Sequence, residues 1–276
     1  MKIAIITLAL LCLGSIAQAA ETRLERGRYL VQSIVACGNC HTPQGPQGPV
    51  PGKDLAGGLM FKERPFTAYA SNITSDKDTG LGNWTDAQII TAIRDGKRPD
   101  GTLIGPPMPF AVYRGISDTD VQAIVAYLRS VPAVNNAVKK SEYRMPLPPA
   151  WGPPVGSVPD VPRGDKVVWG RYLAGPLGHC VECHSTPGLQ GMPDFANALG
   201  AGGMVFKGPW GVSVAPNITP KGMAHYSDAA LKKLITTGVK PDGSRLKPPM
   251  GTDYYAKMDD TDLDALVAYL RSLPPK

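Results

Sequence analysis

The sequence predicts an all-α protein made of two tandem copies of one helical domain. Three observations lead to this prediction: short motifs recur at a nearly constant offset, helix-start motifs precede apolar residues at helical spacing, and a proline-rich stretch separates the copies. Almost nothing alternates with a period of two, so strands are not expected. We divide the chain into a signal peptide at 1–19, a first domain at 20–132, a connector at 133–164 and a second domain at 165–276.

The internal repeat defines the two domains. Residues 118–132 match residues 260–274 at 11 of 15 positions, which is hard to reach by chance. Shorter motifs recur in the same order: Gly27-Arg28-Tyr29-Leu30 as Gly170-Arg171-Tyr172-Leu173, Asn72-Ile73-Thr74 as Asn217-Ile218-Thr219, and Pro99-Asp100-Gly101 as Pro241-Asp242-Gly243. Each half therefore has the size of one small domain.

Three helices are expected in each copy. In the first copy, Thr22 with Glu25 forms a capping box before a helix over 24–36, and Thr85 with Gln88 forms another before Ile89. Ser117 with Asp120 starts the last helix in a similar way. The apolar residues of the last helices follow helical spacing, which predicts that they face the core: Val121, Ile124, Val125 and Leu128, and Leu263, Leu266, Val267 and Leu270.

The connector between the copies is rich in proline. Seven prolines lie in residues 133–164, and proline both fixes its own backbone and removes a hydrogen-bond donor. We therefore expect this segment to run extended, as a semi-rigid spacer.

The N-terminus is typical of an exported protein. Met1-Lys2 precedes a short apolar run, and Ala17-Gln18-Ala19 is a small-x-small cleavage pattern. An uncleaved or lipidated form is the alternative, since Cys12 lies in this run, although Leu11 occupies a position where lipidation favours a small residue. No later segment is long and apolar enough to span a bilayer. We expect a periplasmic protein without an integral membrane anchor.

The charge pattern argues against nucleic acid as a partner. The net charge is +6 and the isoelectric point about 9.0, but the lysines and arginines are scattered. The longest basic clusters are pairs, Lys139-Lys140 and Lys232-Lys233, which are typical of solvated helix faces.

Two Cys-x-x-Cys-His motifs are the most informative feature of the chain. They are Cys37-Gly38-Asn39-Cys40-His41 and Cys180-Val181-Glu182-Cys183-His184. Cysteines one helical turn apart can attach the two vinyl-derived carbons of a porphyrin, and the adjacent histidine then reaches the iron. The motifs therefore predict two covalently bound haem c groups.

Two other interpretations fit the cysteine motifs less well. A thioredoxin-like redox pair gives no reason for a histidine after each second cysteine, and it usually lies beside a βαβ unit that is not expected here. A zinc site would favour four cysteines close together in the sequence. Haem attachment explains more of the pattern than either.

Alignment of the two copies selects a candidate sixth iron ligand in each. Met108 in Pro106-Pro107-Met108 and Met250 in Pro248-Pro249-Met250 occupy equivalent positions. A lone methionine is usually core filler, but the repeated motif favours thioether ligation. A soft sulfur ligand favours reduced iron and raises the potential.

Several other residues are weaker candidates. His179 and His225 have no histidine counterpart in the first copy, so they are poor competitors as iron ligands.

The segment Asp76-Lys77-Asp78-Thr79-Gly80 is partly similar to a calcium loop, but a polar turn explains it better. The Asn-Ile-Thr motifs match the glycosylation pattern, yet their equivalent places indicate a shared loop structure. Trp84 and Tyr226 precede the second helix of each copy, where their polar tips can reach a haem propionate or simply pack.

Taken together, the motifs resemble a dihaem member of the class I cytochrome c superfamily. Asn72-Ile73-Thr74, Trp84-Thr85-Asp86, Met108-Pro109 and Ala126-Tyr127-Leu128-Arg129-Ser130 are similar to motifs in cytochrome c subunits of bacterial periplasmic alcohol, aldehyde and gluconate dehydrogenases. Those relatives usually carry three haem domains, and this chain has two. The resemblance implies His/Met iron at both sites: Cys37, Cys40, His41 and Met108 on one haem, and Cys180, Cys183, His184 and Met250 on the other.

The resemblance implies an electron-transfer protein rather than an enzyme. Its donor would be a periplasmic dehydrogenase, and its acceptor a cytochrome or terminal oxidase of a respiratory chain. Six-coordinate irons leave no open position for substrate. The alternative is a dihaem oxidoreductase of the peroxidase or thiosulfate-oxidising type, which would need a vacant or displaceable iron position.

Overall fold

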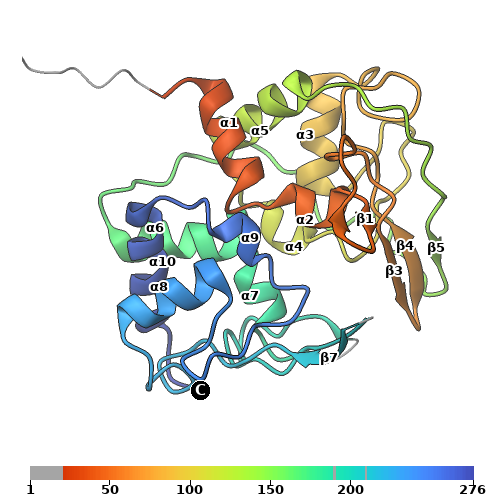
Figure 1. Cartoon of the computed structure of the whole chain (residues 1–276). Coiled ribbons are helices and arrows are strands. Elements are labelled where there is room, and N and C mark those ends of the chain that lie inside the picture. Colours follow the sequence, from red (N-terminus) through yellow and green to blue (C-terminus); the bar gives the residue numbers. More distant parts are fainter. Residues whose placement is uncertain (1–20, 189–190, 209) are drawn as a thin grey trace, which may run out of the picture.

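A computed structural model describes residues 21–188, 191–208 and 210–276. It contains two helical domains that lie side by side, joined by a long extended segment (Figure 1). The predicted signal peptide lies outside the described residues.

The two domains share one order of α-helices and four-residue strands. The first contains α1 (Arg23–Gln32), α2 (Cys37–His41), β1 (Gln44–Gly45), β2 (Gly48–Pro49), β3 (Met60–Glu63), β4 (Phe66–Tyr69), α3 (Asp86–Asp95), α4 (Phe110–Tyr113) and α5 (Asp118–Ser130). The second contains α6 (Lys166–Tyr172), the π-helical turn η1 (Leu173–Leu177), α7 (Cys180–Cys183), β6 (Val205–Gly208), β7 (Gly211–Val214), α8 (Asp228–Thr237), α9 (Thr252–Tyr255) and α10 (Asp260–Ser272). The connecting segment contributes β5 (Glu142–Tyr143).

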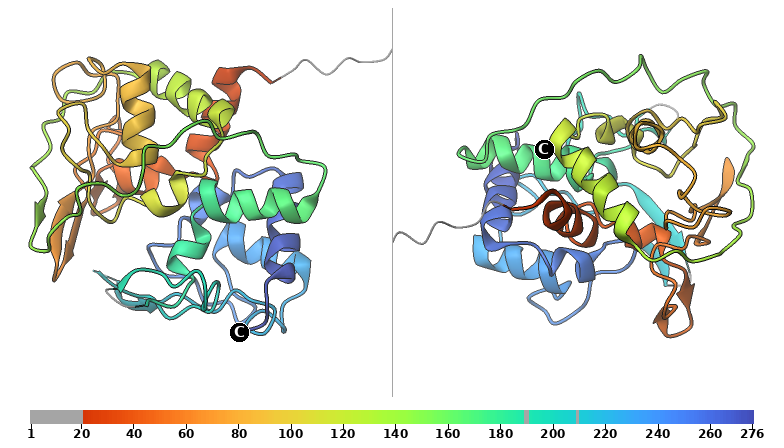
Figure 2. Two further views of the ribbon diagram at one scale, coloured as in Figure 1. Left: turned by 180° about the vertical axis from the view of Figure 1, so that it is seen from behind. Right: turned by 90° about the horizontal axis from the view of Figure 1, so that it is seen from above.

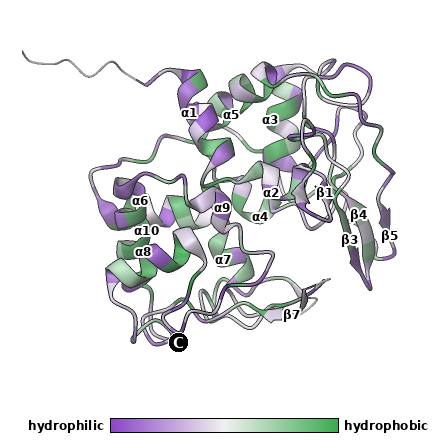
Figure 3. Cartoon of the chain, in the orientation of Figure 1, coloured by the Kyte–Doolittle hydropathy of each residue, from purple (hydrophilic) through white to green (hydrophobic). Residues whose placement is uncertain are grey.

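The prediction of an all-α protein is only roughly right, because the described residues also form three small antiparallel sheets. These are β1–β2, β3–β4–β5 and β6–β7. The strands have two to four residues, too few for a period of two to stand out in the sequence. The core is nevertheless helical, and each long helix carries both polar and apolar residues (Figure 3).

The predicted helix starts are confirmed. Both capping boxes form, with the Thr22 and Thr85 side chains accepting bonds from the backbone N–H groups of Glu25 and Gln88. The first helix ends at Gln32 rather than at residue 36, because Ser33 leaves the helical conformation (φ −123°, ψ −101°). The apolar stripes predicted for α5 and α10 are buried, as expected for core helices.

The terminal helices of each domain cross at a glycine. A Cβ atom added to Gly27 on α1 would collide with the carbonyl oxygen of Ala123 on α5. Gly170 on α6 meets Ala265 on α10 in the same way. The repeated Gly-Arg-Tyr-Leu motif therefore lets two helix backbones touch in each domain.

Residues 133–164 run extended along the first domain before entering α6 (Figure 2). The segment is held by specific contacts rather than hanging free. β5 pairs with β4, the Trp151 indole stacks on Phe110 with ring centroids 5.4 Å apart, and the Val158 carbonyl accepts a bond from the Asp118 backbone N–H.

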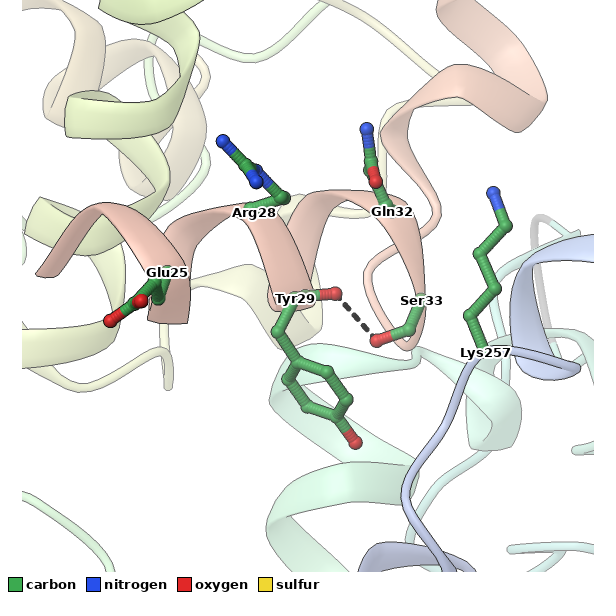
Figure 4. A pocket seen from close by; sticks show the side chains of 6 residues that line it. All are labelled: Glu25, Arg28, Tyr29, Gln32, Ser33 and Lys257. Carbon is green, nitrogen blue, oxygen red and sulfur yellow. Dashed lines mark hydrogen bonds between the residues drawn. The ribbon is translucent and has the colours of Figure 1, made fainter. Parts of the chain in front are cut away.

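Reciprocal hydrogen bonds join the two domains. The Tyr29 hydroxyl on α1 donates to Asp262 on α10 (2.7 Å), and the equivalent Tyr172 hydroxyl on α6 donates to Asp120 on α5 (2.8 Å). Figure 4 shows Tyr29 extending from α1 at a pocket that Lys257 of the second domain also lines. Because equivalent residues exchange contacts, the domains are related by an approximate two-fold axis, as in an isologous dimer.

Candidate functional site

Each Cys-x-x-Cys-His motif forms a short helix directly after a left-handed residue. Ala36 (φ 50°) precedes α2, and His179 (φ 40°) precedes α7. The helical turn places the two cysteines of a motif on one side, three residues apart. Among the described residues, Cys37, Cys40, Cys180 and Cys183 form no disulfide.

The four cysteine residues are half-buried, and their thiols are surrounded by protein atoms. Burial raises the pKa of Cys37 to about 12 and that of Cys40 to about 11, and it raises the pKa of Cys180 and Cys183 to about 12. Redox-active cysteines have the opposite property, a lowered pKa that exposes the thiolate. The environment therefore does not fit a thioredoxin-like pair.

The histidine rings are oriented by backbone carbonyls. His41 Nδ1 lies 2.7 Å from the Ser71 oxygen, and His184 Nδ1 lies 2.8 Å from the Pro216 oxygen. Burial lowers the pKa of both histidines, so the neutral ring is favoured. A neutral ring that donates from Nδ1 has its Nε2 lone pair free for a metal.

The shared loop predicted at the Asn-Ile-Thr motifs is confirmed, but its role in supplying these carbonyls was not predicted from the sequence. Ser71 and Pro216 each come directly before an Asn-Ile-Thr motif. Asn72 is buried, and its side-chain oxygen accepts bonds from the backbone N–H and hydroxyl of Thr74. Asn217 repeats the pattern with Thr219. The Asn-Ile-Thr motifs are thus structural loops beside the histidines. Their repetition at equivalent positions was the sequence signal for a shared structural role.

The two methionines occupy matching loops. Met108 and Met250 both pack against the core and are half-buried, and each follows a cis Pro-Pro bond. In the first domain the Tyr143 hydroxyl donates to the Pro106 oxygen (3.2 Å). In the second, Ser213 Oγ donates to the Pro248 oxygen (2.8 Å). Among the other described methionines, Met60 and Met192 are exposed, Met223 and Met258 are buried in the core, and the half-buried Met145 and Met204 do not follow a Pro-Pro pair.

Both cysteine motifs lie at the boundary between the domains. Asn39, within the first motif, donates from Nδ2 to the Pro249 carbonyl oxygen of the second domain (3.1 Å), and the ring of His179, directly before the second motif, packs against Tyr113 of the first domain. Burial raises the pKa of Glu182, within the second motif, to about 7. The domain interface thus brings together the two sites that the sequence places 143 residues apart.

Buried tyrosines line the same region. Tyr113 on α4 and its counterpart Tyr255 on α9 are both buried, and burial holds their pKa values well above the ordinary range. Tyr113 lies edge-on to the His179 ring, with centroids 5.8 Å apart. Burial lowers the pKa of His179 to about 4, so this histidine is a neutral packing residue beside the site.

The remaining candidates have structural roles. The Asp76 carboxylate accepts bonds from the backbone N–H and hydroxyl of Thr79, both at 2.7 Å, which makes the segment a polar turn. His225 is exposed. Trp84 and Tyr226 pack against the core, and their carbonyls accept bonds from Arg129 and Arg271.

In the described part of the chain, no three histidine, cysteine or acidic side chains are grouped so that they could hold a metal ion by themselves.

The arrangement fits a covalently attached haem in each domain. Each domain has paired cysteines on one helical turn, a histidine whose Nε2 is available, and a half-buried methionine on a separate loop. Each domain also has half-buried apolar side chains that pack against the core, among them Ile73, Ile90, Ile93 and Val112 in the first, and Phe195, Leu199 and Ile235 in the second.

Comparison with known families agrees with this geometry. Residues 22–128 match the family model for cytochrome c oxidase, cbb3-type, subunit III, and residues 177–274 match that for cytochrome c. The chain carries two cytochrome c domains. Each matched region contains one Cys-x-x-Cys-His motif, and the two-domain cytochrome binds two covalently attached haem c groups.

The cytochrome is similar to several known proteins. It is 35% identical to a nicotinate dehydrogenase subunit from Pseudomonas putida over 91% of this chain and 21% of that protein. It is 32% identical to the fructose dehydrogenase cytochrome subunit of Gluconobacter japonicus over 94% of this chain and 54% of that protein. It is 28% identical to a diheme cytochrome c-type protein of Cereibacter sphaeroides over 86% of this chain and 82% of that protein. The chain thus spans about a fifth and about half of the length of the first two relatives.

Proposed function

We propose that this two-domain cytochrome carries electrons from a dehydrogenase to a downstream acceptor. The observation that carries the proposal is the pairing of two haem-attachment motifs across one domain interface. A bound haem c supplies one-electron chemistry at its iron. An electron can then enter at one domain and leave at the other within one polypeptide.

The proposed haem contacts follow the repeat. Cys37 and Cys40 would attach the first haem, and Cys180 and Cys183 the second. His41 and Met108 would bind the iron in the first domain, and His184 and Met250 would bind the iron in the second. The Ser71 and Pro216 carbonyls would fix the orientation of each histidine and raise its basicity through Nδ1.

The proposed ligand sets favour a carrier over an enzyme. A peroxidase or thiosulfate-oxidising enzyme needs an open iron position with acid, base or sulfur groups nearby. The Pro-Pro-Met loops of both domains are alike, so neither domain is distinguished as a substrate site. The relatives named above are themselves cytochromes or subunits of dehydrogenases.

The expected partners follow from the relatives. Their names point to a dehydrogenase as electron donor, and a cytochrome or terminal oxidase is the matching acceptor. The N-terminal sequence supports the periplasm as the location. None of the described helices is both long and apolar enough to cross a membrane.

Visible spectroscopy of the purified protein tests the proposed ligands. Oxidised and reduced spectra are recorded with and without carbon monoxide. We expect both haems to show the long-wavelength band of Met-ligated ferric iron and neither to bind the gas. A haem that binds carbon monoxide or lacks the band would shift the interpretation towards the enzyme.

Substitution of single methionines assigns the ligands. Met250→His should change the spectrum of the second haem and lower its potential, and Met108→His should do the same for the first. Met60→His is the matched control, because Met60 is exposed. An unchanged spectrum in Met250→His would remove Met250 as a ligand.

A further inference from the structure

The loop that carries Met250 is bound by a residue of the first domain. Asn39 Nδ2, within the first Cys-x-x-Cys-His motif, donates to the Pro249 carbonyl oxygen at 3.1 Å. The same nitrogen would lie 3.4 Å from a Cβ atom built on Gly251. Asn39 therefore contacts the residues directly before and directly after Met250, although it lies 210 residues from Pro249 in the sequence.

A second contact joins the same two parts of the molecule. The helix α9 begins directly after Gly251, and it brings the Tyr254 hydroxyl against Gly38 of α2. A Cβ atom on Gly38 would lie only 2.3 Å from that hydroxyl oxygen, so the close approach requires glycine. The Met250 loop and the helix that follows it thus lie against the attachment motif of the first haem.

The repeat places different chemistry at the corresponding positions. Glu182 of the second motif corresponds to Asn39, and Pro107 of the first methionine loop corresponds to Pro249. An ionised carboxylate only accepts hydrogen bonds, so it cannot donate to a proline carbonyl. The Glu182 carboxylate lies instead 4.0 Å from His179 Nδ1 of its own domain. Pro107 is exposed, whereas Pro249 is half-buried.

The two methionine loops are therefore held in different ways. Each loop has one bond to the proline two residues before its methionine, from Tyr143 to Pro106 (3.2 Å) and from Ser213 to Pro248 (2.8 Å). Among the described residues, only the second loop has a further bond from the opposite domain, to the proline directly before the methionine.

A bond at this place restricts the methionine itself. The Pro249 carbonyl belongs to the peptide group that joins Pro249 to Met250, so fixing its oxygen fixes the backbone from which the thioether extends. Groups that hold a metal ligand in its orientation are part of a metal site, and their removal typically weakens the site about tenfold or more.

We propose that Asn39 is a positioning residue for the second haem, and that it holds the Met250 loop in place from within the attachment motif of the first haem. The inference rests on the proposed ligation of the second iron by Met250. It makes the second haem dependent on the first domain, while the first haem has no equivalent dependence on Glu182.

Substitution of Asn39 in the full-length haem-loaded protein tests the proposal. Asn39→Leu keeps the shape of the side chain but removes the amide donor. We expect the Met-ligated band of the second haem to weaken, its potential to fall and its reduced iron to bind carbon monoxide, because the thioether is held less firmly. The band of the first haem should persist, although Asn39 lies in the first motif. Met250→His identifies the spectral component that belongs to the second haem.

Hydrogen exchange of the same variant gives a readout that does not depend on the iron spectrum. Exchange at residues 250–256 should quicken about fivefold in Asn39→Leu, the effect of one lost hydrogen bond of ordinary strength. If leucine at this position prevents haem attachment, Asn39→Ala removes the same donor with a smaller side chain and is measured instead.

Two matched variants show which domain responds. Tyr143→Phe removes the bond to Pro106, so it should weaken the Met-ligated band of the first haem and leave that of the second. Gln44→Ala removes an amide that lies close to the first motif but bonds to the Thr42 oxygen of its own domain. Both haems should keep their bands in Gln44→Ala.

The possible outcomes separate this inference from the proposed function. An unchanged spectrum in Met250→His would overturn the proposed ligand and this inference together. If Met250→His changes the second haem, but the Asn39 variant alters neither the band of that haem nor the exchange of residues 250–256, the inference alone fails. A spectral change confined to the first haem in the Asn39 variant would also overturn it, because the amide would then act within its own domain.

Discussion

Single residues decide how closely the helices of each domain approach. Gly27 lets α1 touch the backbone of α5, and Gly170 does the same for α6 and α10. In an isolated helix, alanine is about 1 kcal/mol more favourable than glycine. At these two crossings the added methyl meets a carbonyl group that cannot move without shifting a whole helix. The steric cost therefore exceeds the gain in helix propensity.

Gly27→Ala should thus destabilise the protein by about 1–3 kcal/mol, the usual cost of overpacking. Denaturant unfolding followed by circular dichroism measures this change. Gly156→Ala is the control, because no atom lies within 4 Å of a Cβ at that position. It should change stability by less than about 0.5 kcal/mol. Equal stability of the two variants would mean that the helices do not cross at Gly27.

Asn72 connects the histidine loop to the chain that leaves the first domain. Its amide donates to Thr79 Oγ1 and the Val134 carbonyl, while its oxygen accepts from Thr74. Asn72→Ala would remove these bonds and leave the buried Thr74 backbone N–H without its partner, at a cost of about 1–3 kcal/mol. Because Ser71 orients His41, the potential of the first haem should also change.

The repeat supplies a matched comparison for this prediction. Asn217→Ala should affect only the second haem, through Pro216 and His184. Spectroelectrochemical titration that resolves the two haems measures both variants. If Asn72→Ala and Asn217→Ala shift the same haem, the two loops do not act within their own domains.

At the scale of elements, the sequence predicted the helices better than the strands. Capping boxes and apolar stripes are local patterns, so Thr22, Thr85 and the residues of α5 could be placed without tertiary information. The strands of the β3–β4 and β6–β7 hairpins have only four residues each, and such short strands leave too little alternation for a periodic pattern to stand out. The course of the connector was also beyond prediction, because it depends on single anchors far apart in the chain.

One of these anchors makes the connector sensitive to acid. Asp118 accepts bonds from Ser157 Oγ (2.6 Å) and the Val158 backbone N–H (3.2 Å), and it pairs with Arg94. The bond from Ser157 is the main cause that lowers the pKa of Asp118 to about 2. A lowered pKa means that the ionised carboxylate holds the connector above pH 4, and that this contribution is lost as the pH falls from 4 to 2.

We therefore expect the connector to loosen between pH 4 and pH 2. Hydrogen exchange of residues 155–160 at a series of pH values measures the effect. Asp118→Asn should expose these residues at neutral pH and remove most of their dependence on acid. A steep acid transition that survives in Asp118→Asn would point to another carboxylate.

At the scale of the whole molecule, the two domains are held together by equivalent residues. Arg26 pairs with Asp120, and Trp169 at the equivalent position donates to Asp262 (2.6 Å). Each aspartate then receives a tyrosine from the opposite domain. The motif repeat could be found in the sequence, but these contacts could not, since Tyr29 and Asp262 are 233 residues apart and nothing in the repeated motifs indicates that they meet.

The tyrosine pairs should make the two domains unfold as one unit. Tyr29→Phe and Tyr172→Phe each remove a hydroxyl bonded to a carboxylate, so each should cost about 1–2 kcal/mol. With both changes, unfolding should separate into two transitions, because both reciprocal bonds are lost. Differential scanning calorimetry of the haem-loaded protein detects the separation. Tyr69→Phe, a change on β4 away from this interface, should keep the unmodified profile. A single sharp transition in the double variant would show that the domain interface is held mainly by its apolar contacts.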